Sequence, residues 1–165
     1  MTTDRRETDR DTPDRRDPER VDLTQPTNYL EELGGRECLE RVHAVFYDKL
    51  FAHSWLGKFF EGKKRWMLES QQTEFLMGVF GGPRIYGGRG PMEAHKHMFI
   101  TDEIFEIRHE LLKESLHEAR VPEALHERWL RADQSMKKSV VKQSLDQCVG
   151  RYNNEPIMVH PNPDL

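Results

Sequence analysis

The sequence predicts an all-α fold, and three observations support this prediction. Apolar residues recur every three or four positions in four long segments, which is the period of a helix with one buried face. Clusters of glycine and proline, such as Gly81-Gly82-Pro83, separate these segments and are typical of helix ends. No segment alternates apolar and polar residues in the way that a half-exposed strand would.

Each helix is placed by its apolar period and by the residues at its ends. A short first helix ends at Leu33-Gly34-Gly35, and an aromatic segment at residues 55–60 separates the first two long helices. Thr101 is suited to capping a helix N-terminus, and Asp102 and Glu103 in the first turn suit the positive end of the helix dipole. The expected long helices cover residues 36–51, 63–80, 101–116 and 121–149.

Length and composition indicate one folded domain between two polar ends. The 165 residues are 36% hydrophobic, enough to bury a core. Residues 1–26 interleave Arg with Asp and Glu and hold few apolar side chains, so we predict that this tail is disordered. We assign residues 27–152 to the helical domain. Residues 153–165 contain three prolines, which predicts an extended C-terminal tail, either a strap or a loose end.

Charge and cysteine content argue against several classes of function. A net charge of −4 provides no basic field for nucleic acid. Cys38 and Cys148 match no metal-binding spacing and make no disulfide framework, which indicates a reducing compartment. No apolar run approaches the ~20 residues that cross a bilayer, and the chain opens without the apolar stretch of a secretory signal. We therefore expect a cytoplasmic monomer without nucleic-acid or membrane partners.

The segment from Gly81 to Ile100 carries the strongest indication of function. It runs through a glycine-rich turn and then sets His95 and His97 on a short apolar stretch. A histidine that a loop presents behind a long amphipathic helix is suited to bind a buried cofactor. The neighbouring side chains suit a planar apolar cofactor better than a hydrated metal ion; they are Met92, Met98, Phe99 and Ile100.

Two polar residues interrupt the apolar faces of the first two long helices. Gln72 lies on the same stripe as Leu68, where an unpaired amide would cost ~1–3 kcal/mol. Tyr47 lies beside Phe46, on the partly buried side of the preceding helix. Each alone would be expected to hydrogen-bond the backbone, as most buried polar groups do. Together with His95 on the other side, they favour a pocket with an iron atom between them.

A series of short motifs points to one family when their order and spacing are taken together. They are Leu33-Gly34-Gly35, Phe46-Tyr47, Phe59-Phe60, Gln72 with Glu74-Phe75-Leu76, Gly81-Gly82-Pro83, Tyr86-Gly87-Gly88-Arg89, Glu93-Ala94-His95-Lys96 and Ile100-Thr101. Through them the chain resembles the truncated haemoglobins from about Tyr29 to Val141. Group I, the N-type or cyanobacterial-type branch, is most similar. The resemblance implies a truncated globin-like, two-over-two helical sandwich around haem b, an iron protoporphyrin.

The resemblance also implies a role for each residue near the haem. His95 matches the proximal ligand of the iron, with His97 as the rival, and a backbone carbonyl in residues 86–91 would orient the ring. Tyr47 and Gln72 match the distal residues that hydrogen-bond dioxygen. The other positions implied at the haem are Phe60, Leu68 and Gln71, with Tyr86 and Lys64 as partners of the propionates.

Two positions differ from the pattern of the family. Arg108 stands where an apolar pocket residue is expected. Surface exposure of Arg108 is the simplest expectation, and the alternatives are a guanidinium at the cofactor edge or Ile107 facing the haem instead. Gln71 stands where some relatives carry a histidine that is a sixth ligand of the iron, so we expect an open distal position or a weakly bound water or Tyr47-linked state.

The implied function is the binding of diatomic ligands at a five-coordinate haem iron. Dioxygen, nitric oxide and carbon monoxide are the expected ligands, and hydrogen bonds from Tyr47 and Gln72 would slow the release of dioxygen. Such a pocket suits nitric oxide dioxygenation or other oxygen chemistry, with an unidentified reductase. The alternatives are a haem-based gas sensor or redox partner without turnover, and a haem-free helical protein whose histidines are structural.

Overall fold

Helices make up the regular structure of this computed structural model, which describes residues 28–165. They are α1 (Tyr29–Leu33), α2 (Arg36–Ala52), η1 (Leu56–Phe60), α3 (Arg65–Val79), α4 (Pro91–His95), α5 (Asp102–Glu118), α6 (Glu123–Ser135), α7 (Lys137–Val140) and η2 (Leu145–Gln147). The described residues form no strand, which confirms the all-α prediction. The tail predicted to be disordered, residues 1–26, lies outside the described residues. None of the described helices is long and apolar enough to cross a membrane.

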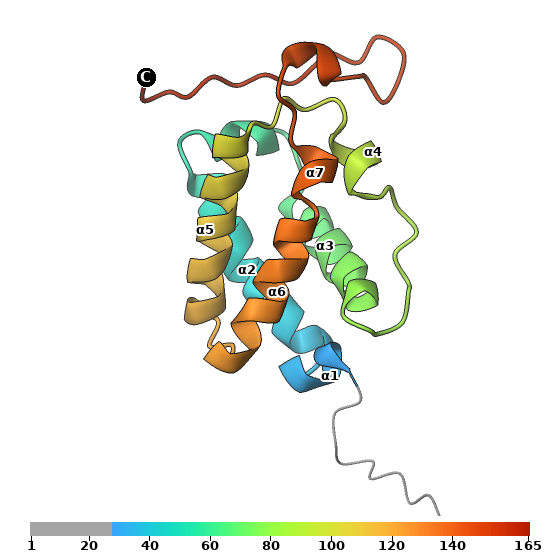
Figure 1. The fold of residues 1–165 in the computed structure, drawn as a ribbon, viewed down its shortest axis with the longest axis vertical. Helices are drawn as coiled ribbons and strands as arrows, with labels where there is room; N and C mark the ends of the chain where they lie inside the picture. Colours follow the sequence, from blue (N-terminus) through green and yellow to red (C-terminus); the bar gives the residue numbers. More distant parts are fainter. Residues whose placement is uncertain (1–27) are drawn as a thin grey trace, which may run out of the picture.

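The long helices form two layers of two. In Figure 1, α5 and α6 run side by side in front of α2, and α3 lies beside α2. The helix α2 contacts both α3 and α5, and α5 contacts α6. One pair therefore consists of α2 and α3 and the other of α5 and α6, which is the predicted two-over-two sandwich.

Two helix ends follow directly from the residues that occupy them. The Thr101 hydroxyl accepts a hydrogen bond from the backbone N–H of Ile104 at 3.3 Å, which caps α5 as predicted. At the end of α1, Gly34 adopts the left-handed conformation with φ of 97°. A side chain at this position would be strained, so glycine allows the chain to turn sharply into α2.

The last predicted helix, over residues 121–149, is wrong in its second half. The structure ends α6 at Ser135 and α7 at Val140. Beyond α7, Val141 forms an isolated bridge with Ile100, and the Lys142 N–H donates to the Ile100 carbonyl at 2.8 Å. A backbone group bound to a distant segment cannot also continue a helix, so tertiary pairing overrides the helical period here.

The C-terminal segment, residues 143–165, crosses one end of the sandwich above α4 and α5 (Figure 1). We call it the strap. Its Met158 exchanges two backbone hydrogen bonds with the segment that follows α4, donating to His97 at 2.8 Å and accepting from Phe99 at 2.9 Å. Farther along, the Trp55 indole N–H donates to the His160 carbonyl at 2.7 Å. The strap is thus extended and bound to the helical body at several points.

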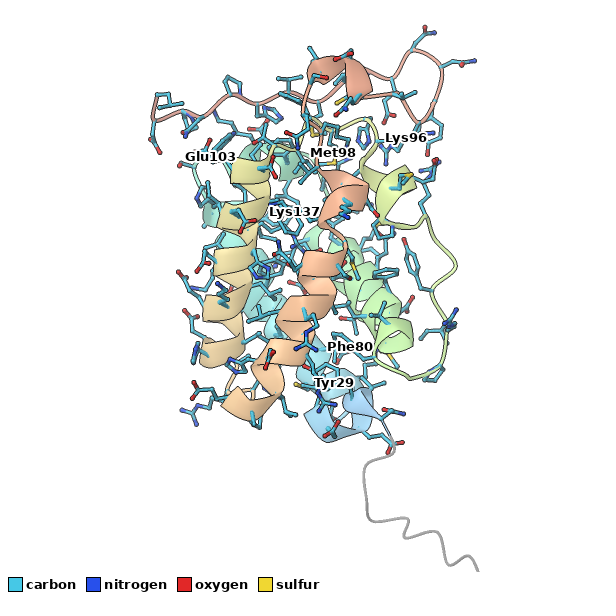
Figure 2. All side chains as sticks on the ribbon, viewed as in Figure 1. Tyr29, Phe80, Lys96, Met98, Glu103 and Lys137 are labelled. Carbon is cyan, nitrogen blue, oxygen red and sulfur yellow. The ribbon has the colours of Figure 1, made fainter. Side chains whose placement is uncertain are left out.

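Aromatic rings close the other end of the sandwich. The Phe80 ring meets the edges of Tyr29 and Trp129, with ring centres 4.8 and 5.1 Å apart. Figure 2 shows Tyr29 and Phe80 together at the lower end of the molecule. The Tyr29 hydroxyl also donates to the Leu125 carbonyl at 2.6 Å, which ties α1 to α6.

Candidate functional site

A cavity of about 400 Å³ lies inside the sandwich. Its walls come from α2, η1, α3, α5 and α6, from residues 86–100, and from the strap. The volume falls within the range of roughly 300–1,000 Å³ that is typical of small-molecule and cofactor sites. Most of the wall consists of aromatic and aliphatic side chains. The cavity is therefore suited to a largely apolar, drug-sized or larger molecule.

The structure brings the predicted site residues together at this cavity. The residues from the prediction that line it are Tyr47, Phe60, Leu68, Gln71, Gln72, Tyr86 and His95. The rival histidine, His97, also lines it. Lys64, predicted as a propionate partner, does not belong to the wall, and the preceding residue, Lys63, takes that place.

His95 is held in a single orientation at the end of α4. Its Nδ1 lies 2.7 Å from the Pro91 carbonyl, and because a carbonyl only accepts, Nδ1 carries the proton and donates. The acceptor expected within residues 86–91 is thus confirmed. Removal from water by the surrounding side chains lowers the pKa of His95 to about 4, so the ring is neutral. The side chain is nevertheless partly accessible. Its Nε2 therefore offers a free lone pair.

His97 lies in a different environment two residues later. Its Nδ1 is sealed from solvent and hydrogen-bonds no atom of the described residues. Its Nε2 lies 3.9 Å from the Glu155 carboxylate of the strap, which is too far for a hydrogen bond but close enough for electrostatic attraction. Glu155 is itself paired with Arg151 at 2.6 Å, which lowers the pKa of Glu155 to about 2. His97 is thus directed toward the strap.

The cavity contains hydrogen-bond donors that no described residue satisfies. The Tyr47 hydroxyl makes no hydrogen bond within residues 28–165, and the same holds for the amides of Gln71 and Gln72. None of these groups is sealed within the protein, so they are accessible from the cavity. Burial raises the pKa of Tyr47 to about 12, which keeps its hydroxyl protonated as a donor. These groups are available to a molecule that fills the cavity.

Aromatic rings shape the walls on both sides. Phe60 stacks on Phe51 with ring centres 5.0 Å apart and meets the edge of Tyr47 at 6.1 Å. Elsewhere in the wall, Tyr86 meets the edge of Phe75, with ring centres 5.6 Å apart. The Tyr86 hydroxyl donates to the Arg89 carbonyl at 2.8 Å, so its donor is used within the turn. Flat aromatic faces of this kind suit a planar occupant.

Four cationic side chains line the cavity against one carboxylate. They are Lys63, Arg89, Arg108 and Arg151, and the carboxylate is Asp133. Sequence reasoning missed Lys63, and it missed Arg89 although that residue belongs to one of the motifs. It also missed Arg151, because residue 151 lies beyond the motifs and no pattern relates the strap to the cavity. Arg108 is paired with Asp133 and Arg151 with Glu155, so Lys63 and Arg89 are the two of these cations without a carboxylate partner within residues 28–165, and they favour an occupant that carries negative charge.

The expectation that Arg108 is exposed on the surface is wrong. Its Nη1 donates to both oxygens of Asp133, at 2.8 and 3.0 Å, and the Asp133 side chain is only 8% exposed. The guanidinium carbon also lies 5.2 Å from the ring centre of Phe46. A buried carboxylate and an aromatic face thus hold Arg108 against the cavity, while Ile107 takes no part in the wall.

Comparison with known proteins identifies the family. The family model described as bacterial-like globin matches residues 28–142, which covers well over half of the chain. The chain belongs to this globin family. A group 1 truncated hemoglobin of Tetrahymena pyriformis is 32% identical over 103 residues, covering 62% of this chain and 85% of the relative. The corresponding protein of Mycolicibacterium paratuberculosis is 33% identical, covering 62% and 76%. The predicted resemblance to the truncated haemoglobins is confirmed.

Solved structures agree with this assignment. The crystal structure of the Tetrahymena pyriformis truncated hemoglobin in its Fe(III) form matches with a TM-score of 0.65 at 28% identity, covering 70% of this chain and 99% of that one. A group II truncated hemoglobin from Bacillus anthracis matches with a TM-score of 0.64 at 23% identity, which shows a shared fold. The protein is thus a haem-binding globin, and globins bind diatomic gases such as oxygen. The family match ends at residue 142, so the strap lies beyond it.

Proposed function

We propose that this globin binds haem b through His95 and holds dioxygen or another diatomic ligand beside Tyr47 and Gln72. One observation carries the proposal: the bare Nε2 of His95 and the unpartnered hydroxyl of Tyr47 both line one cavity with flat aromatic walls. Haem, held by His95, would supply an iron atom that can bind a small diatomic ligand. The remaining chemistry belongs to residues of the chain.

The residues present fit haem b in shape and in charge. The apolar and aromatic wall suits a planar macrocycle, and Phe60 offers a ring for contact with one face. Haem b carries two propionates, and Lys63, Arg89 and Arg151 provide cations at the wall that can bind them with charge-assisted hydrogen bonds. The strap thereby adds a cofactor contact, through Arg151, that the family match does not include.

His95 is better suited than His97 to bind the iron. The Pro91 carbonyl fixes the ring of His95 and makes Nε2 a stronger electron donor. The Nε2 of His97 instead faces the carboxylate of Glu155. Both histidines line the cavity, but Nδ1 of His97 is sealed and its Nε2 is directed toward the strap.

Tyr47 and Gln72 are placed to retain a bound ligand. A hydrogen bond from either side chain to a ligand with partial negative charge contributes about 1–2 kcal/mol, which slows dissociation about tenfold. Carbon monoxide carries less charge than bound dioxygen and gains less from the same donors. We therefore propose that the site discriminates in favour of dioxygen and releases it slowly.

Slow release suits a reaction with the bound ligand better than delivery. The reaction that we propose is nitric oxide dioxygenation, in which both atoms of dioxygen join nitric oxide to give nitrate. One electron per turnover must then return to the iron from a reductase. Cys38 and Cys148 are free thiols, which suits the reducing cytoplasm in which such reductases work.

Spectra of the purified full-length chain test the haem and its ligands. A Soret band after addition of haemin, and its shift with dioxygen and carbon monoxide, is the expected result. The variant Tyr47→Phe is expected to release dioxygen about tenfold faster, with a much smaller change for carbon monoxide. As a control, Tyr86→Phe removes a hydroxyl that is already bound to the Arg89 carbonyl and should leave both rates near those of the natural protein. Equal effects of Tyr47→Phe on both gases would contradict the proposed donor.

Stopped-flow mixing of the oxygenated protein with nitric oxide tests the reaction. Rapid conversion to the ferric protein with one equivalent of nitrate is expected. Slow or absent conversion would reject the dioxygenase function and leave a sensor or redox partner with the same haem site.

A further inference from the structure

Arg108 is a charged group in the cavity that the proposed haem site does not require. It reaches the wall from α5, pairs with Asp133 of α6, and lies over the Phe46 ring of α2. Removing such a pair from water costs desolvation free energy, and an apolar side chain would fill the same space without that cost. A charge retained here calls for a ligand that it can bind.

The guanidinium has donors that remain free. Only Nη1 bonds to Asp133, whereas Nε and Nη2 hydrogen-bond no atom within residues 28–165. Neither of these nitrogens is sealed, because His97 Nδ1 is the one unpartnered side-chain atom of the described chain that is closed off from solvent. Since Arg108 belongs to the cavity wall, its free N–H groups are available to an occupant of the cavity.

The contacts of Arg108 place it near Tyr47, one of the proposed ligand donors. Phe46, over which the guanidinium lies, is the neighbour of Tyr47 on α2. The positive charge of Arg108 also acts on three titratable groups: it opposes the rise that burial causes in the pKa of Tyr47, and it adds to the fall that burial causes in the pKa of His43 and His95. The guanidinium thus lies within electrostatic reach of the position where Tyr47 would meet a ligand.

Asp133 does not cancel the attraction for an anion. Its Oδ2 is shared, at 3.0 Å from Arg108 and 2.8 Å from Nδ1 of His109. The carboxylate therefore fixes the fork of the guanidinium while dividing its negative charge between two partners. Inside a protein, where the dielectric constant is low, the remaining N–H groups bind an anion more strongly than they would in water.

The cations that face the propionates come from other parts of the fold. Lys63 precedes α3, Arg89 follows the glycine-rich turn, and Arg151 belongs to the strap. In Figure 1 the strap and the turn before α4 lie at the top and at one side, away from the middle of α5. Arg108, near the middle of α5, thus remains available after the propionates are bound.

We propose that Arg108 makes the ligand space of this globin selective for small monoanions, such as azide or nitrite, over neutral ligands such as imidazole. The flat fork of a guanidinium matches anions that present one or two acceptor atoms. This inference rests on the proposed haem site, because the anion would bind next to the haem.

Ligand binding to the ferric, haem-loaded full chain tests the proposal through shifts of the Soret band. The double variant R108L/D133L removes both charges together, so that no carboxylate is left buried without a partner. Compared with the natural protein, it should bind azide at least about tenfold more weakly, which corresponds to the loss of one charge-assisted hydrogen bond. Its affinity for imidazole, a neutral ligand, should change less than about threefold, within the scatter of a lost neutral contact.

The exposed ion pair of Glu127 and Arg131 on α6 provides a matched control. The variant E127L/R131L makes the same chemical change outside the cavity and should leave azide and imidazole binding unchanged. A second variant, Arg108→Gln, keeps a shorter side chain with an N–H donor but removes the charge, and it decides the question if the double variant fails to fold. It should also weaken azide binding selectively.

Two results would overturn the proposal. One is an unchanged affinity for azide in the Arg108 variants. The other is a parallel loss for azide and imidazole, which would show general damage to the cavity. Failure of the haem proposal gives a different result, since the natural protein would then show neither a Soret band nor a shift with imidazole.

Discussion

His95 and His97 have the same side chain, but their neighbours give the two imidazole rings different hydrogen-bonding partners. One ring is oriented by the Pro91 carbonyl and keeps a free Nε2, while the other faces Glu155 with its Nε2 and leaves Nδ1 sealed. The sequence already contained both histidines and favoured His95 by resemblance. It contained no sign of Glu155, which approaches from the strap.

The role proposed for His95 predicts chemical rescue. The variant His95→Gly should lose the Soret band of bound haem, since no side chain remains to bind the iron, and added imidazole should restore it by filling the vacated space. The corresponding variant His97→Gly should retain haem without imidazole. Absorption spectra at matched haemin concentrations make the measurement, and the opposite pattern would assign the iron to His97.

From a further histidine, His43, we predict how the free energy of unfolding depends on pH. His43 is 1% exposed, its Nδ1 lies 2.7 Å from the Thr73 hydroxyl, and burial lowers its pKa from 6.5 to about 3. Between these two values the unfolded chain binds a proton that the folded chain does not. The contribution of His43 to the free energy of unfolding is therefore fully present above pH 6.5. It is lost as the pH falls toward 3, by up to about 1.4 kcal/mol per pH unit.

Replacement of His43 isolates this effect. The variant His43→Asn keeps a polar atom near Thr73 but cannot titrate, so the free energy of unfolding should fall less steeply between pH 6 and pH 4 than in the natural protein. Denaturant unfolding at several pH values gives the slope. His117→Asn, at an exposed position, serves as the control and should retain the natural slope. An unchanged slope in His43→Asn would show that other groups cause the acid sensitivity.

At the scale of the elements, prediction from the sequence succeeds where local signals decide. The helix that begins after Thr101 has its cap and its acidic first turn in adjacent residues, and α2 and α3 have clear apolar periods between glycine-rich ends. The last helix fails because its end depends on Ile100, about forty residues away in the chain. Leu145 and Val149 continue the apolar period of this predicted helix, but the side chains of both are more than half exposed, so the period does not mark a buried face there.

The cavity wall likewise combines residues that local sequence patterns predict with residues that they do not. Every residue to which the resemblance gave a role at the haem lies within the motifs or on a periodic helix, and apart from Lys64 each of them lines the cavity. Of the apolar neighbours expected to suit the cofactor, Met98 and Ile100 line the cavity, whereas Met92 and Phe99 do not. Arg151 and Met158 also line it, but they come from the strap, whose position is set by backbone pairing with residues 97–99. Pairing between distant extended segments leaves no periodic pattern in a sequence.

Because the strap supplies Arg151 to the proposed haem site, we predict that it slows the release of haem. The double variant R151M/E155Q removes the cation proposed to bind a propionate, together with the carboxylate that would otherwise face it. Loss of one charge-assisted hydrogen bond, worth about 1.5–3 kcal/mol, should speed haem release tenfold or more. Transfer of haem to excess apomyoglobin, followed by absorbance, measures the rate. Arg84→Met, an exposed change away from the cavity wall, should leave the rate unaltered, and equal rates in both variants would remove Arg151 from the site.

At the scale of the whole molecule, the cavity affects the stability of the fold. A cavity of about 400 Å³ in the middle of a small helical sandwich removes packing contacts that the surrounding helices would otherwise make. Two cations of its wall, Lys63 and Arg89, also have no carboxylate partner within residues 28–165, and an acidic occupant would supply one. An occupant that is apolar in its body and acidic at its edge satisfies both conditions, and its binding free energy then adds to that of folding.

Stability of the entire fold should therefore depend on haem. A ligand that binds only the folded state at 100 times its Kd stabilises it by about 2.7 kcal/mol, so haemin should raise the free energy of unfolding by at least this amount. Denaturant unfolding of the full chain with and without haemin measures the difference. In His95→Gly the increase should fall to the part that comes from apolar contact and propionate binding, because the bond to the iron is lost. An increase of the same size in both proteins would mean that the haem is held without His95, and the ligand assignment would be wrong even though the cavity binds haem.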